Sequence, residues 1–366
     1  MKNIICISAI RWDDMRQRIQ HFMGELSKHY RILYVNPAFD YSKAIKYKKQ
    51  KGYFPKEYEK VNETLHVVSP ILPFSIRKVQ TLNKIVRKHW FSSKVVEYLE
   101  KLDLKKEDNI VFVSDIYAID VLKDIPYSKL IYDCCDEVAE FSSSYKEVAN
   151  CNEKYLIENA DIVLTSAQKL YDRIVKENPN TYIVRNGVEY DHFYGKCAGS
   201  EKGIGFIGAL ADWIDVEIME YLAEHIPDTK LHIIGPISVK TDNLKKFNNV
   251  VIYGKQDYAV LPELFKHFNV ALLPFKINKL TLSVNPIKFY EYCAGGKISI
   301  ATRLPELENY IPHIYIADTK EEFCNMTIKA LQQDDKFFIK KVEKIGKENS
   351  WQQRAMDVQR IIEERL

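Results

Sequence analysis

Several features that mark whole classes of protein are missing from this 366-residue sequence. No apolar stretch approaches the ~20 residues that a membrane-spanning helix needs. The apolar run at the N-terminus, Ile4 to Ile7, is too short for the core of a secretory signal. The formal net charge is only +3, so the chain as a whole is not built to bind nucleic acid. We therefore expect a cytoplasmic protein in which any basic partner surface is local.

The cysteines lack the spacing of a metal or redox site. No two of them form a C-x-x-C pair, and no cysteine–histidine cluster has zinc spacing. Their number is odd and several lie within apolar runs, which favours free buried thiols in a reducing compartment. We predict neither a metal nor another cofactor. The seven residues are Cys6, Cys134, Cys135, Cys151, Cys197, Cys293 and Cys324.

The length and the ordinary composition indicate two globular domains. Hydrophobic residues make up 46% and charged residues 28%, and the chain is longer than one hydrophobic core usually spans. Short apolar runs alternate with amphipathic segments, a pattern typical of parallel sheets covered by helices. In the first half we predict strands at 4–7, 32–35, 66–68, 110–113, 130–133, 162–165 and 182–184, and helices at 16–29 and 166–177.

The same pattern restarts after Asn186-Gly187, and a polar stretch from Tyr194 to Lys202 reads as a linker. Ser350 is a suitable N-cap for a final helix. We predict an α/β fold with an N-terminal domain at 1–187, a C-terminal domain at 202–345, and a helix at 350–366 that packs back toward the N-terminal domain. Ligands of such sheets bind at the carboxyl ends of the strands. The predicted elements of the second half are strands at 204–207, 231–234, 250–252, 270–273 and 298–301, and helices at 216–224, 261–268 and 287–294.

The segment from Ser283 to Lys297 carries the clearest chemistry. It reads Ser-Val-Asn-Pro-Ile-Lys-Phe-Tyr-Glu-Tyr-Cys-Ala-Gly-Gly-Lys. Pro286 suits the first turn of a helix, whose free amides and dipole favour a diphosphate. Lys288 in that turn opposes the helix dipole unless an anion binds beside it. Glu291, three residues on, can face the same side and accept hydrogen bonds from two ribose hydroxyls. An ordinary surface Lys–Glu pair is the alternative interpretation.

This segment resembles the P-x-K-x-x-E-Y-x-A-x-G-K-P signature of GT-B glycosyltransferases, family 4 and its relatives. In that family the glutamate binds the donor ribose, and the loop and helix start before it hold the diphosphate and the sugar. The resemblance implies two Rossmann-like domains that face a central cleft, with a C-terminal helix closing the chain. It also implies a donor site made of Gly208, Lys276, Ser283, Asn285, Lys288 and Glu291.

Other segments match the family in the same order along the chain. The segment 206–210 resembles the first strand and turn of the donor domain, and 232–236 resembles its second strand. The segments 160–166 and 184–188 resemble the end of the acceptor domain and the hinge, and Ser350-Trp351 resembles the start of the closing helix. More narrowly, the chain resembles bacterial cell-surface polysaccharide enzymes of the teichuronic acid and capsule type at Trp12, Arg18, Gln20, residues 132–137 and Asp212-Trp213.

The sequence also departs from the family pattern. Ser283 stands where the first glutamate of the E-x7-E motif normally touches the donor sugar, so the identity of that sugar stays open. The Arg/Lys pair often found after the first donor-domain strand is not apparent after Gly208, and Lys276 and Lys288 are the nearest substitutes. Residues 203–208 match G-x-G-x-x-G, but the first two glycines fall at the start of a strand. We reject a NAD site and keep Gly208 as a point where backbone approaches the donor.

Carboxylates that end a strand in the first half are candidates for a general base. Among Asp133, Asp136 and Glu137 we favour Asp136 for this role, with helix capping as the alternative. The family resemblance implies transfer with retention of configuration, but inversion with Asp136 as the base stays open. Lys288 and Asp136 are thus the predicted catalytic residues. Lys288 and the helix amides would neutralise the leaving diphosphate without a metal ion.

Two segments of the first half combine basic and aromatic residues. Residues 41–60 hold seven lysines against Glu57 and Glu59, interleaved with five aromatic residues, and residues 76–94 add six basic residues beside Trp90 and Phe91. This composition suits an anionic membrane surface, such as the inner face of the plasma membrane. A solvated loop and helix face is the alternative. Nucleic acid fits less well, because no binding motif accompanies the charge.

These observations predict a glycosyltransferase. It would move a sugar from a nucleoside diphosphate sugar, with a UDP-sugar as the expected donor, to a lipid-linked or polysaccharide acceptor in cell-surface glycan synthesis. A nucleotide-sugar epimerase on the same fold would need no acceptor and no membrane-facing patch. A non-catalytic GT-B subunit that regulates a partner transferase is supported by Ser283 and opposed by Lys288 and Glu291.

Overall fold

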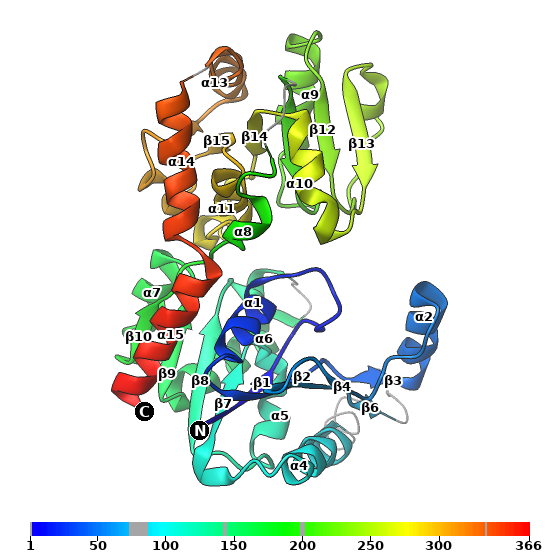
Figure 1. Ribbon diagram of the computed structural model, residues 1–366, viewed down its shortest axis with the longest axis vertical. Coiled ribbons are helices and arrows are strands. Elements are labelled where there is room, and N and C mark those ends of the chain that lie inside the picture. Colours follow the sequence, from blue (N-terminus) through cyan, green and yellow to red (C-terminus); the bar gives the residue numbers. More distant parts are fainter. Residues whose placement is uncertain (1, 73–86, 142–144, 198–201, 334) are drawn as a thin grey trace. The chain divides into compact units, whose positions relative to one another are not determined.

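The computed structural model describes residues 2–72, 87–141, 145–197, 202–333 and 335–366 (Figure 1). The chain divides into two compact units, each built around a largely parallel sheet. The first unit contains Met1–Ser166, Leu170–Val184 and Ala355–Leu366, and the second contains Ala167–Lys169 and Arg185–Arg354. The chain therefore enters the second unit twice and returns to the first unit for its last residues.

In the described part of the first unit, eight strands form one sheet in the order β10-β9-β8-β7-β1-β2-β5-β4. Neighbouring strands run parallel except β4, which is antiparallel to β5. All five residues of β1 are buried, as expected for a strand covered on both faces. The strand bounds are β1 (Asn3–Ile7), β2 (Arg31–Val35), β4 (Tyr58–Lys60), β5 (Leu65–Val68), β7 (Asn109–Val113), β8 (Lys129–Cys134), β9 (Ile162–Thr165) and β10 (Thr181–Ile183), with β3 (Phe39–Asp40) and β6 (Ile71–Leu72) forming a separate parallel pair.

The helices of the first unit follow its strands along the chain. In α1 the buried Ile19, Phe22, Met23 and Leu26 recur at helical spacing, so one stripe of this helix is apolar and packs inward. Its start is stabilised by the backbone N–H of Gln17, which donates to Gln20 Oε1 at 2.8 Å. The helix bounds are α1 (Arg18–Leu26), α2 (Tyr41–Lys51), α4 (Ser92–Lys101), α5 (Ile119–Leu122), α6 (Lys146–Asn159) and α7 (Gln168–Ile174).

The second unit contains a six-stranded parallel sheet, counted over the described residues, in the order β13-β12-β11-β14-β15-β16. The strand order reverses between β11 and β14, the point at which doubly wound sheets bind ligands. The strands are β11 (Ile204–Ile207), β12 (Leu231–Ile234), β13 (Val250–Gly254), β14 (Val270–Leu273), β15 (Ile298–Thr302) and β16 (Tyr315–Ala317). The helices are α8 (Tyr190–Phe193), α9 (Val216–His225), α10 (Leu261–Leu264), α11 (Ile287–Ala294), α12 (Pro305–Glu308), α13 (Lys320–Gln332) and α14 (Lys336–Glu348).

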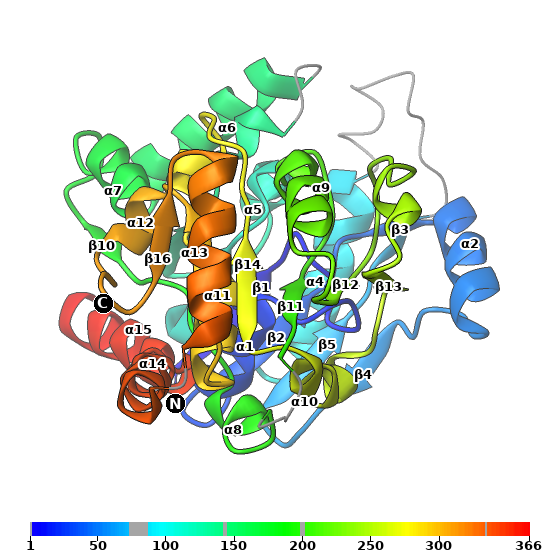
Figure 2. The same ribbon diagram turned by 90° about the horizontal axis from the view of Figure 1, so that it is seen from above.

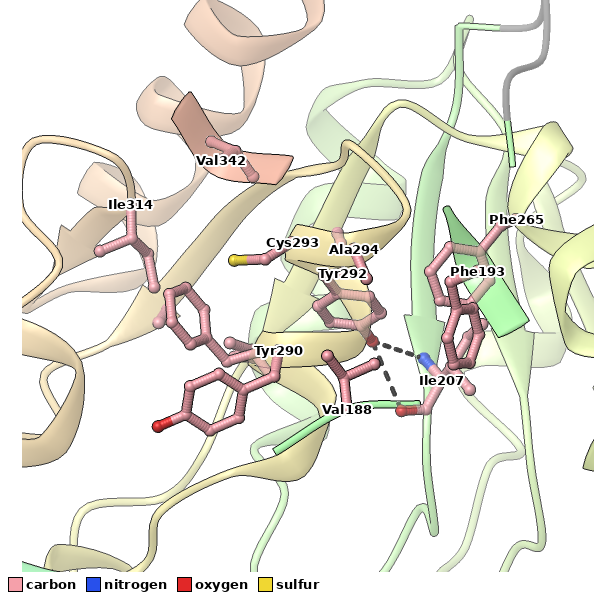
Figure 3. Close-up of a cluster of buried hydrophobic side chains, with 14 of the residues drawn as sticks. Val188, Phe193, Ile207, Phe265, Tyr290, Tyr292, Cys293, Ala294, Ile314 and Val342 are labelled. Atoms are coloured by element: carbon pink, nitrogen blue, oxygen red, sulfur yellow. Dashed lines mark hydrogen bonds between the residues drawn. The ribbon is translucent and has the colours of Figure 1, made fainter. Parts of the chain in front are cut away.

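Strand alternation in the second unit builds a separate apolar core on each face of the sheet. Ile204 and Phe206 of β11 pack with α9 and α13, which lie beside the strands in Figure 2. Ile207 points to the other face, where it belongs to a core that also contains buried side chains of α8, α11 and α14 (Figure 3). The hydroxyl of Tyr292 on α11 accepts a hydrogen bond from the backbone N–H of Ile207 at 2.8 Å. This bond ties α11 directly to the strand beside the switch point.

The last helix, α15 (Trp351–Arg365), begins in the second unit, and its residues from Ala355 onward belong to the first. Ser350 Oγ accepts from the backbone N–H of Gln353 at 3.2 Å, which confirms Ser350 as the N-terminal cap. Among the residues that the structure describes, no helix is long and apolar enough to cross a membrane.

The structure confirms the predicted α/β class and each strand predicted above. Helix α11 has the predicted bounds, whereas the helix predicted at 261–268 is α10 followed by a 3-10 turn at Phe265–His267. The sequence analysis did not single out α2, α6, α13 or α14. Residues 198–201 of the predicted linker and 73–86, which include much of the second basic segment, lie outside the described residues.

Candidate active site

The candidate donor site begins with the loop that leaves the carboxyl end of β14 and leads into α11. Thr281, in the middle of this loop, is fully buried and bonds back to Asn278. Its backbone N–H donates to Asn278 Oδ1 at 3.0 Å, and its hydroxyl accepts from the N–H of Asn278 at 3.0 Å. Because these bonds close the loop on itself, the chain reaches Ser283 and α11 in a defined conformation.

Helix α11 starts without a side-chain cap in the described structure, and its first turn holds no acidic residue. Pro286 lies just before the helix as its N-cap rather than within the first turn, and Ile287 and Lys288 are the first helical residues. Proline has no side-chain acceptor for the first amides. An uncapped helix start with a lysine in its first turn attracts an anion through both its amides and its dipole.

Lys288 and Glu291 are brought together as the spacing predicts. Lys288 Nζ donates to Glu291 Oε2 at 2.6 Å. The Glu291 side chain is only 5% exposed, against 26% for Lys288. This burial excludes an ordinary surface pair, because a carboxylate taken out of water needs a partner. The pair thus places a buried carboxylate and its cation one turn from the free amides of α11.

Ser283 and Asn285 differ in how well the protein satisfies them. Ser283 is fully buried, and its hydroxyl has no hydrogen-bond partner among the described residues. Asn285 is also buried, but its side chain is fully engaged: Oδ1 accepts from Asn186 N–H at 2.9 Å, and Nδ2 donates to Tyr290 and Glu306. Ser283 therefore keeps a free polar atom next to the helix start, whereas Asn285 holds the chain in place. Donor contacts for both residues remain predictions.

Gly208 lies directly after β11, close to Gly235, which directly follows β12. It has a φ of 155°, and a side chain on the neighbouring Gly235 would come within 1.9 Å of the Gly208 carbonyl oxygen. The Gly208 N–H already donates to Ile234 O at 2.9 Å. A donor contact at Gly208, which remains a prediction, would use other backbone atoms. Gly203 and Gly205 are packing positions, since a side chain would come within 2.3 Å of His267 or Phe268, respectively.

Lys276 follows β14 and is exposed to solvent. Its backbone N–H donates to Trp213 O at 2.9 Å, which joins the loop to the segment after β11. Its neighbours Phe275 and Ile277 line a cavity of about 250 Å³ together with Thr302, Arg303 and residues 317–320. This volume is below the ~300–1,000 Å³ typical of small-molecule pockets. The cavity nevertheless shows that the carboxyl edge of the sheet is concave beside Lys276.

Asp136 belongs to the first unit, whereas the candidate donor-site residues belong to the second. Of the three candidate bases there, Asp133 is held by Arg18, whose Nε and Nη2 lie 3.0 and 2.9 Å from its carboxylate oxygens. Glu137 lies 3.5 Å from Arg173. Asp136 is partly buried, and burial raises its pKa to about 7 although Cys135 and Arg18 oppose the rise. A carboxyl that titrates near neutrality suits proton transfer.

The sequence analysis missed Glu306, which accepts a hydrogen bond from Asn285, and Arg185, which pairs with Glu306. Arg185 Nε donates to Glu306 Oε2 at 2.8 Å, and Glu306 is 2% exposed. A glutamate in the first turn of a short helix after Pro305 was visible as a helix-start signal. The local sequence did not indicate that Glu306 is buried or that it pairs with an arginine 121 residues away.

No protein-family model matches the chain. TuaH of Bacillus subtilis (strain 168), named as a candidate teichuronic acid biosynthesis glycosyltransferase, is 25% identical to it over 215 residues. The match covers 52% of this chain and 54% of TuaH, so the chain spans about half the length of this curated relative.

Solved glycosyltransferase structures share the fold over the whole chain. Sucrose-phosphate synthase from Thermosynechococcus elongatus has a TM-score of 0.75 at 14% identity and matches 100% of this chain and 99% of its own. Anabaena HepE in complex with UDP-glucose has a TM-score of 0.69 at 12% identity, and the match covers 100% of both chains. A Staphylococcus aureus TarM variant in complex with UDP has a TM-score of 0.67 at 14% identity, and the match covers 99% of both chains. The chain therefore has the GT-B architecture of two Rossmann-like units.

Proposed function

We propose that the chain is a glycosyltransferase that binds a UDP-sugar in its second unit. The observation that carries the proposal is the buried Glu291, paired at 2.6 Å with Lys288 in the uncapped first turns of α11. That pair follows the strand at the switch point of the sheet, where open α/β sheets bind ligands. The name of TuaH, the UDP-glucose bound to HepE and the UDP bound to TarM support this reaction and this donor.

Each group at the start of α11 suits one part of a UDP-sugar. The Glu291 carboxylate would accept hydrogen bonds from the ribose hydroxyls, and the first helix amides would face the diphosphate. When the bond between the anomeric carbon and the diphosphate oxygen breaks, negative charge grows on the leaving UDP. The Lys288 ammonium would stabilise that charge without a metal ion. The resemblance to family 4 supports transfer with retention of configuration.

Transfer with inversion of configuration is a second candidate mechanism, and the raised pKa of Asp136 favours it. An inverting transferase needs a base that removes the proton of the acceptor hydroxyl as the new glycosidic bond forms. Asp136, with a pKa of about 7, holds this proton more readily than an ordinary aspartate. The configuration of the product, determined by NMR, distinguishes the two mechanisms.

We further propose that the acceptor is a lipid-linked or growing cell-surface glycan reached at an anionic membrane. The TuaH name supports this class of acceptor. The side chains of helix α2 support membrane binding. Ala44 and Tyr47 are buried, whereas four lysines are exposed, namely Lys43, Lys46, Lys48 and Lys49. Exposed aromatic side chains surround these lysines, namely Tyr41, Tyr53 and Phe54, at 57%, 50% and 39% exposure. Cations beside interfacial aromatics match an anionic lipid surface.

The test of the donor is a thermal-unfolding series with UDP, UDP-sugars and ADP. A ligand at 100 times its Kd should stabilise the protein by ~2.7 kcal/mol. We expect UDP and one UDP-sugar to raise the Tm and ADP at the same concentration to leave it unchanged. No shift with any UDP compound would contradict the proposal.

Turnover distinguishes a transferase from an epimerase. With the stabilising UDP-sugar and a membrane extract that contains lipid-linked glycans, we expect UDP release that depends on the extract. Conversion of the UDP-sugar to its epimer without acceptor would identify an epimerase instead. Binding without either reaction would favour the non-catalytic subunit.

A further inference from the structure

Glu306 is a buried carboxylate of the second unit to which the proposed reaction assigns no role. It lies in the first turn of α12, after the carboxyl end of β15, and is 2% exposed. Its Oε1 accepts from the backbone N–H of Gln168 at 2.7 Å. Its Oε2 accepts from Arg185 Nε at 2.8 Å and from Asn285 Nδ2 at 3.1 Å. All three partners are N–H donors, so the site is built for a carboxylate.

Asn285 connects Glu306 to the proposed donor site. It directly precedes Pro286, the N-cap of α11, and it is 2% exposed. Besides Glu306, its Nδ2 donates to the hydroxyl of Tyr290 on α11 at 3.0 Å. Its Oδ1 and its carbonyl oxygen accept from the backbone and side-chain nitrogens of Asn186 at 2.9 and 2.6 Å. The residue next to the helix start is thus held by four bonds to three partners.

Three of the residues that bond Glu306 and Asn285 lie in the segments where the chain enters the second unit. Gln168 belongs to the short segment Ala167–Lys169 of the second unit, and Arg185 and Asn186 are the first residues of its long segment, Arg185–Arg354. Arg354, the last residue of the unit, donates through Nε to Asn186 O at 3.3 Å. Burial lowers the pKa of Arg185, but Glu306 outweighs it, and the net shift of the Arg185 pKa is upward.

We propose that Glu306 is a positioning residue for the donor site: through Asn285 it sets where α11 begins and hence where Lys288, Glu291 and the first amides lie. This inference rests on the proposed function and adds a residue to it. A displacement of ~1 Å in a group that positions a substrate can lower the reaction rate by about 100-fold. A glutamine at 306 would turn an amide N–H toward N–H donors, and the start of α11 would shift to relieve the conflict.

The experiment compares Glu306→Gln with Glu153→Gln. Glu153, in the first unit, is also a buried carboxylate on a helix, and Arg173 donates to its two oxygens at 3.0 Å each. Both substitutions should lower the Tm. Calorimetric titration of folded protein with UDP and UDP-glucose should show a loss of affinity of roughly tenfold or more for Glu306→Gln and less than about twofold for Glu153→Gln. Glu306→Asp, which keeps the charge but moves it by one methylene, provides the same test if Glu306→Gln does not fold.

The outcomes separate this inference from the proposed function. Wild-type affinity in the Glu306 variants, or an equal loss in Glu153→Gln, would show that Glu306 only stabilises the fold. A loss for UDP-glucose but not for UDP would make Glu306 a sugar contact and overturn the positioning role. Wild-type protein that fails to bind UDP would overturn the proposed function, and this inference with it.

Discussion

At the scale of single residues, substitution can separate the roles proposed for Glu291 and Lys288. In Glu291→Gln the buried ion pair is lost, and the proposed hydrogen bonds to the ribose would no longer be charge-assisted. We expect UDP affinity to fall by ~1.5–3 kcal/mol, which is roughly 10- to 150-fold. Calorimetry measures this, with Glu308→Gln as the control because Glu308 is exposed in the same unit. Equal affinities for UDP in the two variants would remove Glu291 from the ribose site.

Lys288 should act mainly as the sugar leaves. Because charge on the diphosphate grows in the transition state, Lys288→Met should lower kcat by more than it weakens UDP-sugar binding. Steady-state kinetics measures both parameters in one titration. A variant in which KM rises and kcat is unchanged would show uniform binding rather than transition-state stabilisation.

Asp136 should make the stability of the protein depend on pH. An aspartate in an unfolded chain has a pKa of ~3.9, whereas burial raises that of Asp136 to about 7. The folded state therefore holds this proton up to higher pH than the unfolded state, and the resulting stabilisation is lost as pH rises from 4 through 7. In urea unfolding, the free energy of unfolding of Asp136→Asn relative to that of the wild type should increase as pH rises from 4 to 7. Above pH 7 the difference between the two proteins should stay constant. A difference that is the same at pH 4 and pH 8 would contradict the raised pKa.

At the scale of elements, α2 should carry the membrane affinity. Each lysine near an anionic leaflet contributes about 1 kcal/mol, and salt screens this attraction. Changing Lys43, Lys46, Lys48 and Lys49 to Gln should therefore abolish most binding to anionic liposomes at low salt. Co-sedimentation with neutral and anionic liposomes across a salt series measures the effect.

The matched control lies on α14 of the second unit, which also exposes lysines beside an aromatic side chain, Phe337. Four of its exposed lysines, Lys336, Lys340, Lys341 and Lys344, are changed to Gln in the same way. We expect this variant to bind as the wild type does. Equal loss in both variants would show that charge alone, rather than α2, determines the binding.

At the scale of the whole molecule, α15 joins the end of the chain to the first unit. Val358 and Ile362, one helical turn apart, are fully buried. Ending the chain after Arg354 would expose their partners and should cost on the order of 3–6 kcal/mol, since burying such a side chain contributes ~1.5–3 kcal/mol. Urea unfolding measures the loss, and a chain that ends after Glu363, which removes only exposed or half-buried residues, is the control. Equal stability of the two truncated chains would show that α15 is dispensable.

Local patterns were enough to predict the elements that position the site. The apolar runs at 204–207 and 270–273 became β11 and β14, and Ile287–Ala294 became α11 with the predicted bounds. The three-residue spacing of Lys288 and Glu291 predicted their contact, because it is set within a single helix. Helices α13 and α14 were missed although each has an N-terminal cap, Thr319 or Asp335, that the sequence analysis did not use.

By itself the sequence determined what depends on residues close together in the chain: the alternation of strands and helices, the helix start after Pro286, and the pairing within α11. Only the tertiary structure decided which charges are buried and which partners complete them. Glu306 meets Arg185 across 121 residues and Asn285 across 21. Asp136 shifts its pKa because surrounding chain removes water from it. Desolvation and long-range hydrogen bonding depend on the packing of distant segments, and no local spacing encodes them.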